Sequence, residues 1–241
     1  KKEKEIFESL INNNVDGILI SVSMETENLD HIIKARERNI PVVFFDRKKD
    51  LKGISSVTID DYQGGYNATQ HLIDAGYKKI FHASGDLNLE IYNQRNQGYL
   101  KALEDNDLEK NFKNIAETIS NIDSGKALAK KILKRKNRPD AIFCSGDYVA
   151  LGIIQELKSQ GIIIPDEIGI IGFGNEPFTE LLELTVTTID QSPKEMGKVT
   201  AKVLLEQISN SKVSIEKKVV LDSTLIERMS TKKMMVLKNL S

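Results

Sequence analysis

Short apolar segments alternate with helix-like segments along this chain, and no other feature of the sequence restricts the fold as much. The clearest unit is residues 140–178, where two apolar runs at 141–144 and 168–173 flank a helical segment that ends at Gly161. Both runs end in small residues, so turns are expected at the carboxyl ends of the strands. Open α/β sheets bind ligands at that edge, beside helix N-termini. The pattern predicts parallel sheets covered by helices on both faces.

The same alternation continues over the rest of the 241 residues. Strands are expected at residues 15–21, 41–45, 56–59, 79–83, 114–118, 141–144, 168–172, 186–189, 217–221 and 224–227. Helices are expected at residues 3–13, 29–39, 62–75, 91–104, 124–135, 149–160 and 193–209. Two of the strands end in the same tripeptide, Ser-Gly-Asp, before a helix. This echo fits two similar lobes whose strand ends face one cleft, although parallel strands in general often end in this way.

The composition limits the classes of partner. Basic and acidic residues are nearly equal in number, 34 and 35, and no basic block stands out. Nucleic-acid binding by this segment on its own is therefore not expected, because phosphate contacts need a concentrated cationic face. The single cysteine, Cys144, excludes an internal disulfide and fits a reducing compartment. No apolar run approaches the roughly 20 residues that span a bilayer, so no membrane partner is predicted. A cytoplasmic location is expected from the reducing compartment that the single cysteine fits.

Motifs for catalysis or cofactor binding are not found in the sequence. The histidines His31, His71 and His82 share no metal-ligand spacing. Gly172 and Gly174 follow a strand but lack the third glycine of a dinucleotide-binding loop. No serine lies in a Gly-x-Ser-x-Gly turn. We therefore predict no metal, no cofactor and no catalytic residue, and a chain that is not an enzyme. A hydrolase or kinase on an α/β scaffold would need a catalytic group that the sequence does not show.

Segments along nearly the whole chain match one known family. They are VDGILI at 15–20, IPVVFFDR at 40–47, RNQGY at 95–99, SGDYVALG at 145–152, IGFGN at 171–175, LTVTTIDQ at 184–191 and LIERMST at 225–231. These segments resemble the effector domain of the lactose-repressor/galactose-repressor family of bacterial transcription regulators.

The resemblance implies a periplasmic-binding-protein-like fold: two lobes, each a doubly wound parallel sheet, joined by three crossovers. The first lobe is expected at residues 1–86 plus 189–222, and the second at 87–188 plus 223–232. Hinges are expected at the crossovers near Asp86, Thr188 and Asp222. The first lobe is expected to lack the family's opening strand, and the N-terminal helix-turn-helix domain is absent from this chain.

The resemblance also implies a function. The chain is interpreted as the effector-sensing and dimerising part of a regulator, in which a small polar metabolite, a sugar or sugar derivative, binds in the interlobe cleft. The regulator would be a homodimer that reaches operator DNA through the helix-turn-helix domain. The alternative is a periplasmic sugar-binding protein of a transporter, which shares the fold. An upstream helix-turn-helix domain would favour the regulator, and an upstream signal peptide would favour the transporter.

The resemblance places Arg95 at the cleft, where a guanidinium suits bidentate bonding to vicinal hydroxyls or a carboxylate. An ordinary surface arginine is the alternative. Asp147 is expected to cap the following helix more than to touch ligand. Tyr148 and Gln191 match cleft-edge positions. The complete set of candidate ligand-binding residues is Asp86, Asn93, Arg95, Asp147, Tyr148, Asn175 and Gln191.

Two departures from the family pattern leave the effector class open. Gly174 stands where the family has an aspartate that accepts ligand hydrogen bonds, and Asn175 is the expected substitute. The segment 119–121, where the family has an aromatic wall, contains no ring. The apolar segment 178–184, together with the helix at 149–160, is predicted to form part of the dimer interface. Packing of that segment under the sheet is the competing interpretation.

Overall fold

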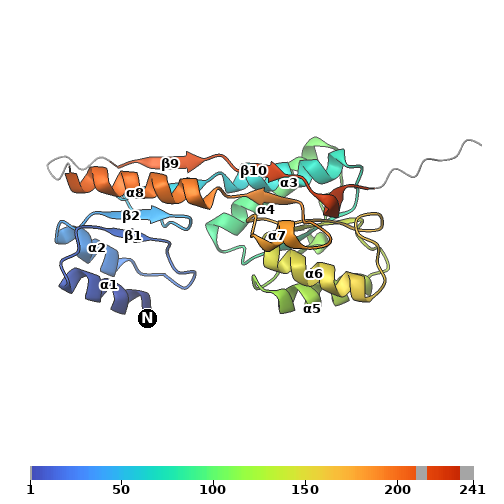
Figure 1. The fold of residues 1–241 in the computed structure, drawn as a ribbon, viewed down its shortest axis with the longest axis horizontal. Helices are drawn as coiled ribbons and strands as arrows, with labels where there is room; N and C mark the ends of the chain where they lie inside the picture. The colour runs from blue at the N-terminus through green and yellow to red at the C-terminus, as the bar shows by residue number, and fades with distance from the viewer. Residues whose placement is uncertain (1, 210–215, 234–241) are drawn as a thin grey trace, which may run out of the picture. The chain divides into compact units, whose positions relative to one another are not determined.

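The computed structural model describes residues 2–209 and 216–233. The chain forms two compact units, unit 1 (Lys1–Asp60 and Ser192–Asp222) and unit 2 (Asp61–Gln191 and Ser223–Ser241). The chain passes from one unit to the other three times, as the family resemblance implies. Two of these passages, after Gln191 and after Asp222, lie close to the predicted crossovers. The path is shown in Figure 1.

The third passage differs from the prediction, because it follows Asp60 and not Asp86. Helix α3 (Asp61–Asp74) and strand β4 (Ile80–Ser84) therefore belong to unit 2. The physical reason is strand pairing: β4 lies between β5 and β6, and its Phe81 is part of the unit 2 core. The predicted first-lobe boundary at residue 86 is therefore wrong.

Unit 1 is built on a four-stranded parallel sheet with the order β1-β2-β3-β9. The strands are β1 (Ile18–Ile20), β2 (Val42–Phe45), β3 (Ser55–Ile59) and β9 (Lys218–Leu221), and the helices are α1 (Lys2–Asn12), α2 (Asp30–Glu37) and α8 (Pro193–Ser209). Side chains alternate between the two faces of a strand. Ile18 and Ile20 of β1 accordingly join Phe7 and Ile11 of α1 in one buried cluster. Figure 1 shows α8 on the other side of β1 and β2 from α1 and α2.

The first two helices of unit 1 are each followed by an asparagine in the left-handed region, Asn14 with φ 51° and Asn39 with φ 60°. Asparagine tolerates this conformation better than most residues do. After α2, the N–H of Asn39 donates to Arg36 O and the N–H of Ile40 donates to Ala35 O. These bonds satisfy carbonyls that a helix end leaves free.

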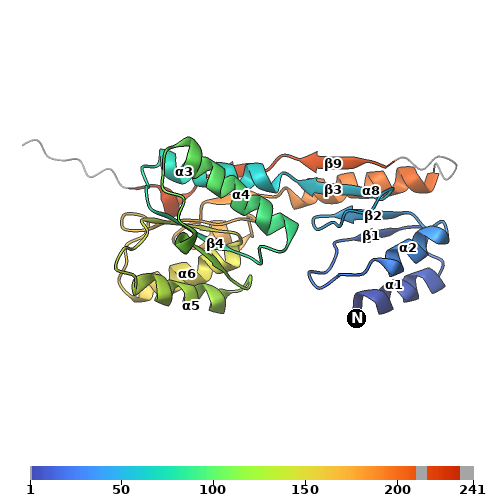
Figure 2. The ribbon, with the colours of Figure 1, turned by 180° about the vertical axis from the view of Figure 1, so that it is seen from behind.

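Unit 2 is built on a second parallel sheet with the order β5-β4-β6-β7. The other strands are β5 (Ile115–Glu117), β6 (Ala141–Cys144), β7 (Gly169–Ile171), β8 (Thr188–Asp190) and β10 (Thr224–Ile226). The helices are α4 (Glu90–Asp105), α5 (Ile122–Leu133), α6 (Asp147–Ser159) and α7 (Phe178–Leu181), with short 3-10 turns at Phe112–Asn114 and Met229–Thr231. Strand β10 runs antiparallel to β8. Figure 2 shows α3 and α4 on one side of the sheet and α5 and α6 on the other.

Two glycines allow α3 and α4 to touch. A Cβ added at Gly98 would lie 2.1 Å from Tyr62 O, and one added at Gly65 would lie 2.2 Å from Arg95 O. No side chain fits at such distances, so glycine is required at both positions for the helices to pack this closely. The contact brings Arg95 of α4 beside the first residue of α3, Asp61.

Candidate functional site

The carboxyl ends of three neighbouring strands meet at one edge of the unit 2 sheet. Strands β4, β6 and β7 are parallel and adjacent, so the turns that follow them, at Gly85, Gly146 and Gly174, lie along that edge. All three turns therefore lie at the kind of edge where open α/β sheets bind ligands. We refer to this part of unit 2 as the effector edge.

Arg95 is a buried residue of the effector edge, with 4% of its surface exposed. Its Nε donates to Asp61 Oδ1 at 2.8 Å, and its Nη1 donates to Ser145 O at 2.8 Å. The guanidinium carbon lies 3.6 Å from the centroid of the Phe173 ring. The interpretation of Arg95 as an ordinary surface arginine is therefore wrong. Because the protein uses two of the three guanidinium nitrogens, Nη2 is the nitrogen left for a ligand.

Beneath Arg95, His82 adds no positive charge to the effector edge. Its ring is fully buried and stacks on Tyr99 and Phe143, with centroid separations of 5.0 and 4.5 Å. Its Nδ1 donates to Phe143 O at 3.2 Å. Burial, together with the positive charge of Arg95, lowers the pKa of His82 to about 3, although the hydrogen bond to Phe143 O opposes the shift. The imidazole is therefore neutral at physiological pH.

Asp147 does not cap helix α6, so that prediction is wrong. The N-cap position is occupied by Gly146, and Asp147 is the first residue of the helix. Its carboxylate accepts from Glu176 N at 2.9 Å and from Thr188 Oγ1 at 2.8 Å. Burial raises the pKa of Asp147, although these hydrogen bonds oppose the shift. The side chain thus fixes the loop after β7 and has little hydrogen-bonding capacity left for a ligand.

The loop after β7 also explains why glycine replaces an acid there. Gly174 has φ 134°, a conformation that other residues rarely adopt, and an added Cβ would lie 3.3 Å from Asp147 Oδ2. The next residue, Asn175, has its Oδ1 occupied by Arg228 Nη2 at 2.9 Å. Asn175 therefore anchors Arg228, and its amide oxygen does not substitute for the missing carboxylate.

The other predicted residues lie at or near the surface. Asp86 and Asn93 are exposed and make local bonds, to Asn88 and Gln97 respectively. Tyr148 is 43% exposed, with its ring 5.1 Å from that of Phe178. Gln191 is partly exposed, with its Nε2 3.5 Å from the position of a Cβ at Gly174.

Sequence reasoning missed several residues of the effector edge: Asp61, Tyr92, Phe173 and Arg228. Tyr92 had a usable signal, since it lies three residues before Arg95 on one helix face, and its ring centroid is 5.5 Å from the guanidinium carbon. For Asp61 the sequence offered only a weak indication of a role in the site, namely an acidic residue at the start of a helix. After β5, Ile119 is 73% exposed, so this strand end presents an aliphatic side chain and no ring.

Each of the two units is built on a parallel sheet, and three chain passages link them. This is the fold of the two-lobe binding proteins. Residues 1–232 match the family described as "Periplasmic binding proteins and sugar binding domain of LacI family", and the chain belongs to this family. The predicted resemblance and fold class are thereby confirmed.

Among its relatives, the chain is 32% identical to the HTH-type transcriptional repressor PurR of Vibrio atlanticus (strain LGP32), over 87% of this chain and 63% of that protein. It is also 32% identical to the HTH-type transcriptional regulator DegA of Bacillus subtilis (strain 168), over 96% of this chain and 68% of that protein. The chain thus spans less than two thirds of the length of PurR.

Solved structures are similar over nearly the whole chain. The transcription regulator CcpA of Lactococcus lactis has a TM-score of 0.85 at 29% identity, covering 96% of this chain and 83% of that one. A LacI family transcriptional regulator from Enterococcus faecalis V583 with bound ribose has a TM-score of 0.85 at 29% identity, covering 97% of this chain and 84% of that one.

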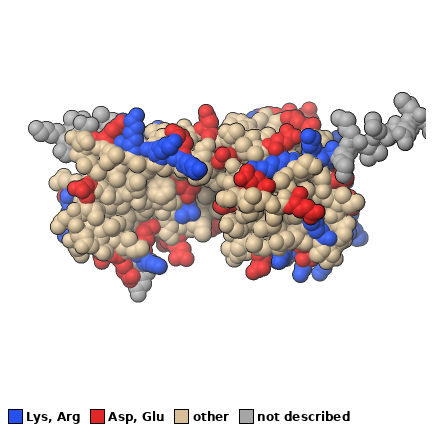
Figure 3. All heavy atoms as spheres, viewed as in Figure 1, with Lys and Arg blue, Asp and Glu red and all other residues tan. Residues whose placement is uncertain are grey.

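Within residues 2–209 and 216–233, no group of three or more His, Cys, Asp or Glu side chains is arranged to hold a metal ion. Over the same residues, no helix is both long and apolar enough to cross a membrane. Figure 3 shows Lys and Arg side chains interspersed with Asp and Glu side chains on both units, in the face that it displays.

Proposed function

We propose that this chain is the effector-sensing part of a cytoplasmic transcriptional regulator, and that a small polar metabolite binds at the effector edge of unit 2. The single observation that carries the proposal is the buried guanidinium of Arg95, fixed by Asp61 and Ser145 and with Nη2 left over. The family membership supports it, as do the regulators among the relatives and the ribose bound to one similar structure.

Hydrogen-bond accounting supports a ligand at Arg95. A guanidinium carries five N–H donors, two of them on Nη2. Asp61 and the Ser145 carbonyl accept two of these N–H groups. A hydroxyl, carbonyl or carboxylate oxygen of the effector would accept from Nη2. A sugar or sugar derivative offers such oxygens and also apolar ring faces for Tyr92 and Ile119.

The whole regulator is proposed to act as a homodimer that reaches operator DNA through a separate domain. In this chain the surface that supports a dimer is α7 with the adjoining side of α6. Leu181 is 79% exposed, and the Tyr148 and Phe178 rings lie beside each other. The rest of the apolar segment packs inside unit 2 instead, because Leu182 and Leu184 lie against the unit 2 core.

The proposed role is non-catalytic, in keeping with the regulators among the relatives. A binding protein of a transporter would share the fold, but fold alone does not fix function. The two roles differ in their readout. Effector binding to a regulator changes the affinity of the full-length protein for DNA, whereas a transport protein has no DNA partner.

Calorimetric titration of the chain with ribose, cellobiose and sugar phosphates tests the proposal. We expect one member of the panel to bind with one-to-one stoichiometry and to perturb the amide signals of residues 92–95 and 145–148. The same compound should change operator binding by the full-length protein. Saturable binding that leaves those amide signals unchanged would contradict the effector edge as the site.

A further inference from the structure

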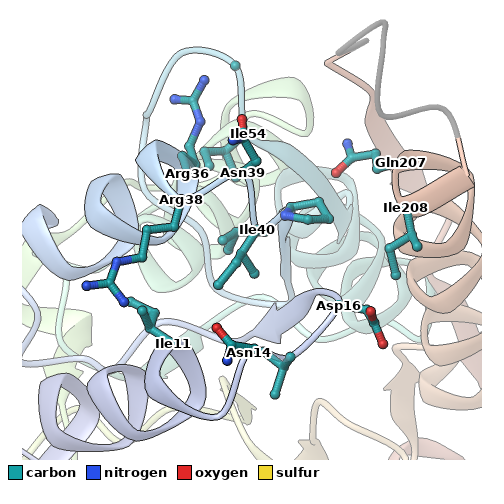
Figure 4. A pocket seen from close by; sticks show the side chains of 14 residues that line it. Ile11, Asn14, Asp16, Arg36, Arg38, Asn39, Ile40, Ile54, Gln207 and Ile208 are labelled. Carbon is teal, nitrogen blue, oxygen red and sulfur yellow. The ribbon is translucent and has the colours of Figure 1, made fainter.

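We propose that unit 1 carries a second ligand site, for a small anion with an apolar body, at the amino-terminal edge of its sheet. A pocket of about 700 Å³ lies there. It is lined by residues that precede β1, β2 and β3 and by the C-terminal ends of α1, α2 and α8 (Figure 4). Small-molecule pockets usually measure roughly 300–1,000 Å³, so this volume suits a metabolite.

The position makes this pocket independent of the effector edge. Parallel α/β sheets normally hold ligands at the carboxyl ends of their strands. Here Asp16, Pro41 and Ile54 each come before a strand, so the pocket lies at the opposite edge of the unit 1 sheet. All its lining residues belong to unit 1. The site therefore does not depend on the proposed effector or on where that effector binds.

The floor of the pocket is apolar. Ile11, Ile40 and Ile54 line it and have exposed fractions of only 2%, 8% and 3%. Figure 4 shows Ile40 in the middle of the pocket, with polar side chains around it. Val15, Pro41 and Ile208 of the lining are partly exposed, and a ligand that covers them removes apolar surface from water, which favours a body such as an aliphatic chain or a ring.

One side of the pocket is cationic and partly fixed in advance. Arg36 donates from Nη1 to Lys52 O at 2.9 Å. Its Nη2 lies only 2.6 Å from where a Cβ of Gly53 would be, so the absence of a side chain at Gly53 lets the guanidinium lie against the loop. A guanidinium held in place loses less freedom on binding. The Arg38 side chain is exposed and has no hydrogen-bond or ion-pair partner among the described residues.

Balancing the helix dipole is a simpler role for two arginines at the end of α2. Hydrogen bonding to the helix end does not occupy the Arg36 guanidinium, which bonds Lys52 O in the loop before β3. Asp16 is the carboxylate of the lining, and Figure 4 shows it on the other side of the pocket from Arg36 and Arg38. The α2 side thus favours an anionic group, for which arginine offers bidentate geometry.

The test uses phenyl phosphate and benzoate as probes. Inorganic phosphate and acetate supply their anionic halves alone, and phenol supplies the ring alone. The 241-residue chain is titrated while backbone amide signals are recorded. We expect saturable shifts at Asn14, Asn39, Ile40 and Gly53. At least one of the two probes should bind roughly tenfold more tightly than either half, because both the floor and the arginines then contribute. Tighter phenyl phosphate indicates a phosphate ester as the natural ligand, and tighter benzoate a carboxylate.

Variants separate a built site from general charge attraction. Arg38→Gln should weaken the preferred probe by roughly tenfold, the usual scale for one lost charge-assisted contact. Lys34→Gln is the control, since it removes one positive charge from the same helix at a residue outside the lining. Equal loss in both variants would overturn the proposal, as would shifts outside the pocket or no shifts at all.

Discussion

At the scale of single residues, the polar side chains of the effector edge mostly bond to other groups of the protein. Arg95 is tied to Asp61, Asp147 is tied to the loop after β7, and Asn175 is tied to Arg228. Each of these bonds uses a donor or acceptor that would otherwise be available to a ligand. The polar residue types alone therefore overstate how many groups can bind the effector. Arg95 keeps a free nitrogen, so it is the residue on which effector binding depends most.

Replacing Arg95 separates its two roles. Arg95→Ala should lower the free energy of unfolding by about 3–5 kcal/mol, because it breaks the buried ion pair with Asp61 and removes the guanidinium that packs on Phe173. It should also weaken effector binding by about 1.5–3 kcal/mol. Urea denaturation and calorimetry measure the two effects. Lys101→Ala is the control, since it breaks an exposed ion pair with Asp105 and should change neither quantity appreciably. Unchanged affinity in a folded Arg95→Ala protein would leave Arg95 with a structural role only.

His82 should make the stability of unit 2 sensitive to acid. Its folded pKa, about 3, lies below the ordinary value of 6.5, so the unfolded chain takes up the proton first as pH falls. Its contribution is therefore complete above pH 6.5 and is lost as pH falls from 6.5 toward 3. The total loss is about 3–5 kcal/mol. His82→Phe keeps the ring stack and should flatten this part of the pH profile of urea denaturation. An equally steep profile in the variant would assign the acid sensitivity to other groups.

At the scale of elements, contact between α3 and α4 positions Arg95, and Gly98 permits that contact. Gly98→Ala should destabilise the protein by about 1–3 kcal/mol, because its Cβ would overlap Tyr62 O. Gly197→Ala is a matched control in helix α8, where an added Cβ meets nothing within 4 Å. There the helix propensity of alanine should stabilise by about 0.5–1 kcal/mol. Thermal unfolding compares the two, and equal shifts would contradict the close-packing argument.

The elements themselves were predictable because strand and helix periodicity is local. Within the described residues, the ten strands and the seven longer helices occur where the sequence predicts them, whereas the four-residue helix α7 and the two 3-10 turns were missed. The boundary at Asp86 failed because β4 pairs with β6, about sixty residues further on, and periodicity contains no information about such pairing. Asp61 was missed for the same reason: it bonds Arg95 from a different helix, and periodicity does not show which helices pack together. Arg95 itself was found through the family resemblance.

At the scale of the whole molecule, the proposed homodimer depends on the apolar segment 178–184, and only part of that segment is exposed. The apolar segment 178–184 divides into two parts: Leu182 and Leu184 pack on the unit 2 core, while Leu181 is 79% exposed. Substituting both Leu181 and Leu182 would therefore confuse lost association with a damaged core. A single substitution at Leu181 is the sharper test.

Leu181→Glu should raise the dimer dissociation constant by roughly tenfold or more, because a carboxylate would be desolvated where an apolar side chain had been buried. Sedimentation equilibrium over a concentration series measures this constant. Ile163→Glu is the matched control, an equally drastic change at another exposed apolar residue of unit 2, 57% exposed and outside helix α7. It should leave association unchanged. If Leu181→Glu and the unsubstituted chain associate equally well, α7 is not part of the interface, and association lost equally in both variants would reflect added charge and no specific surface.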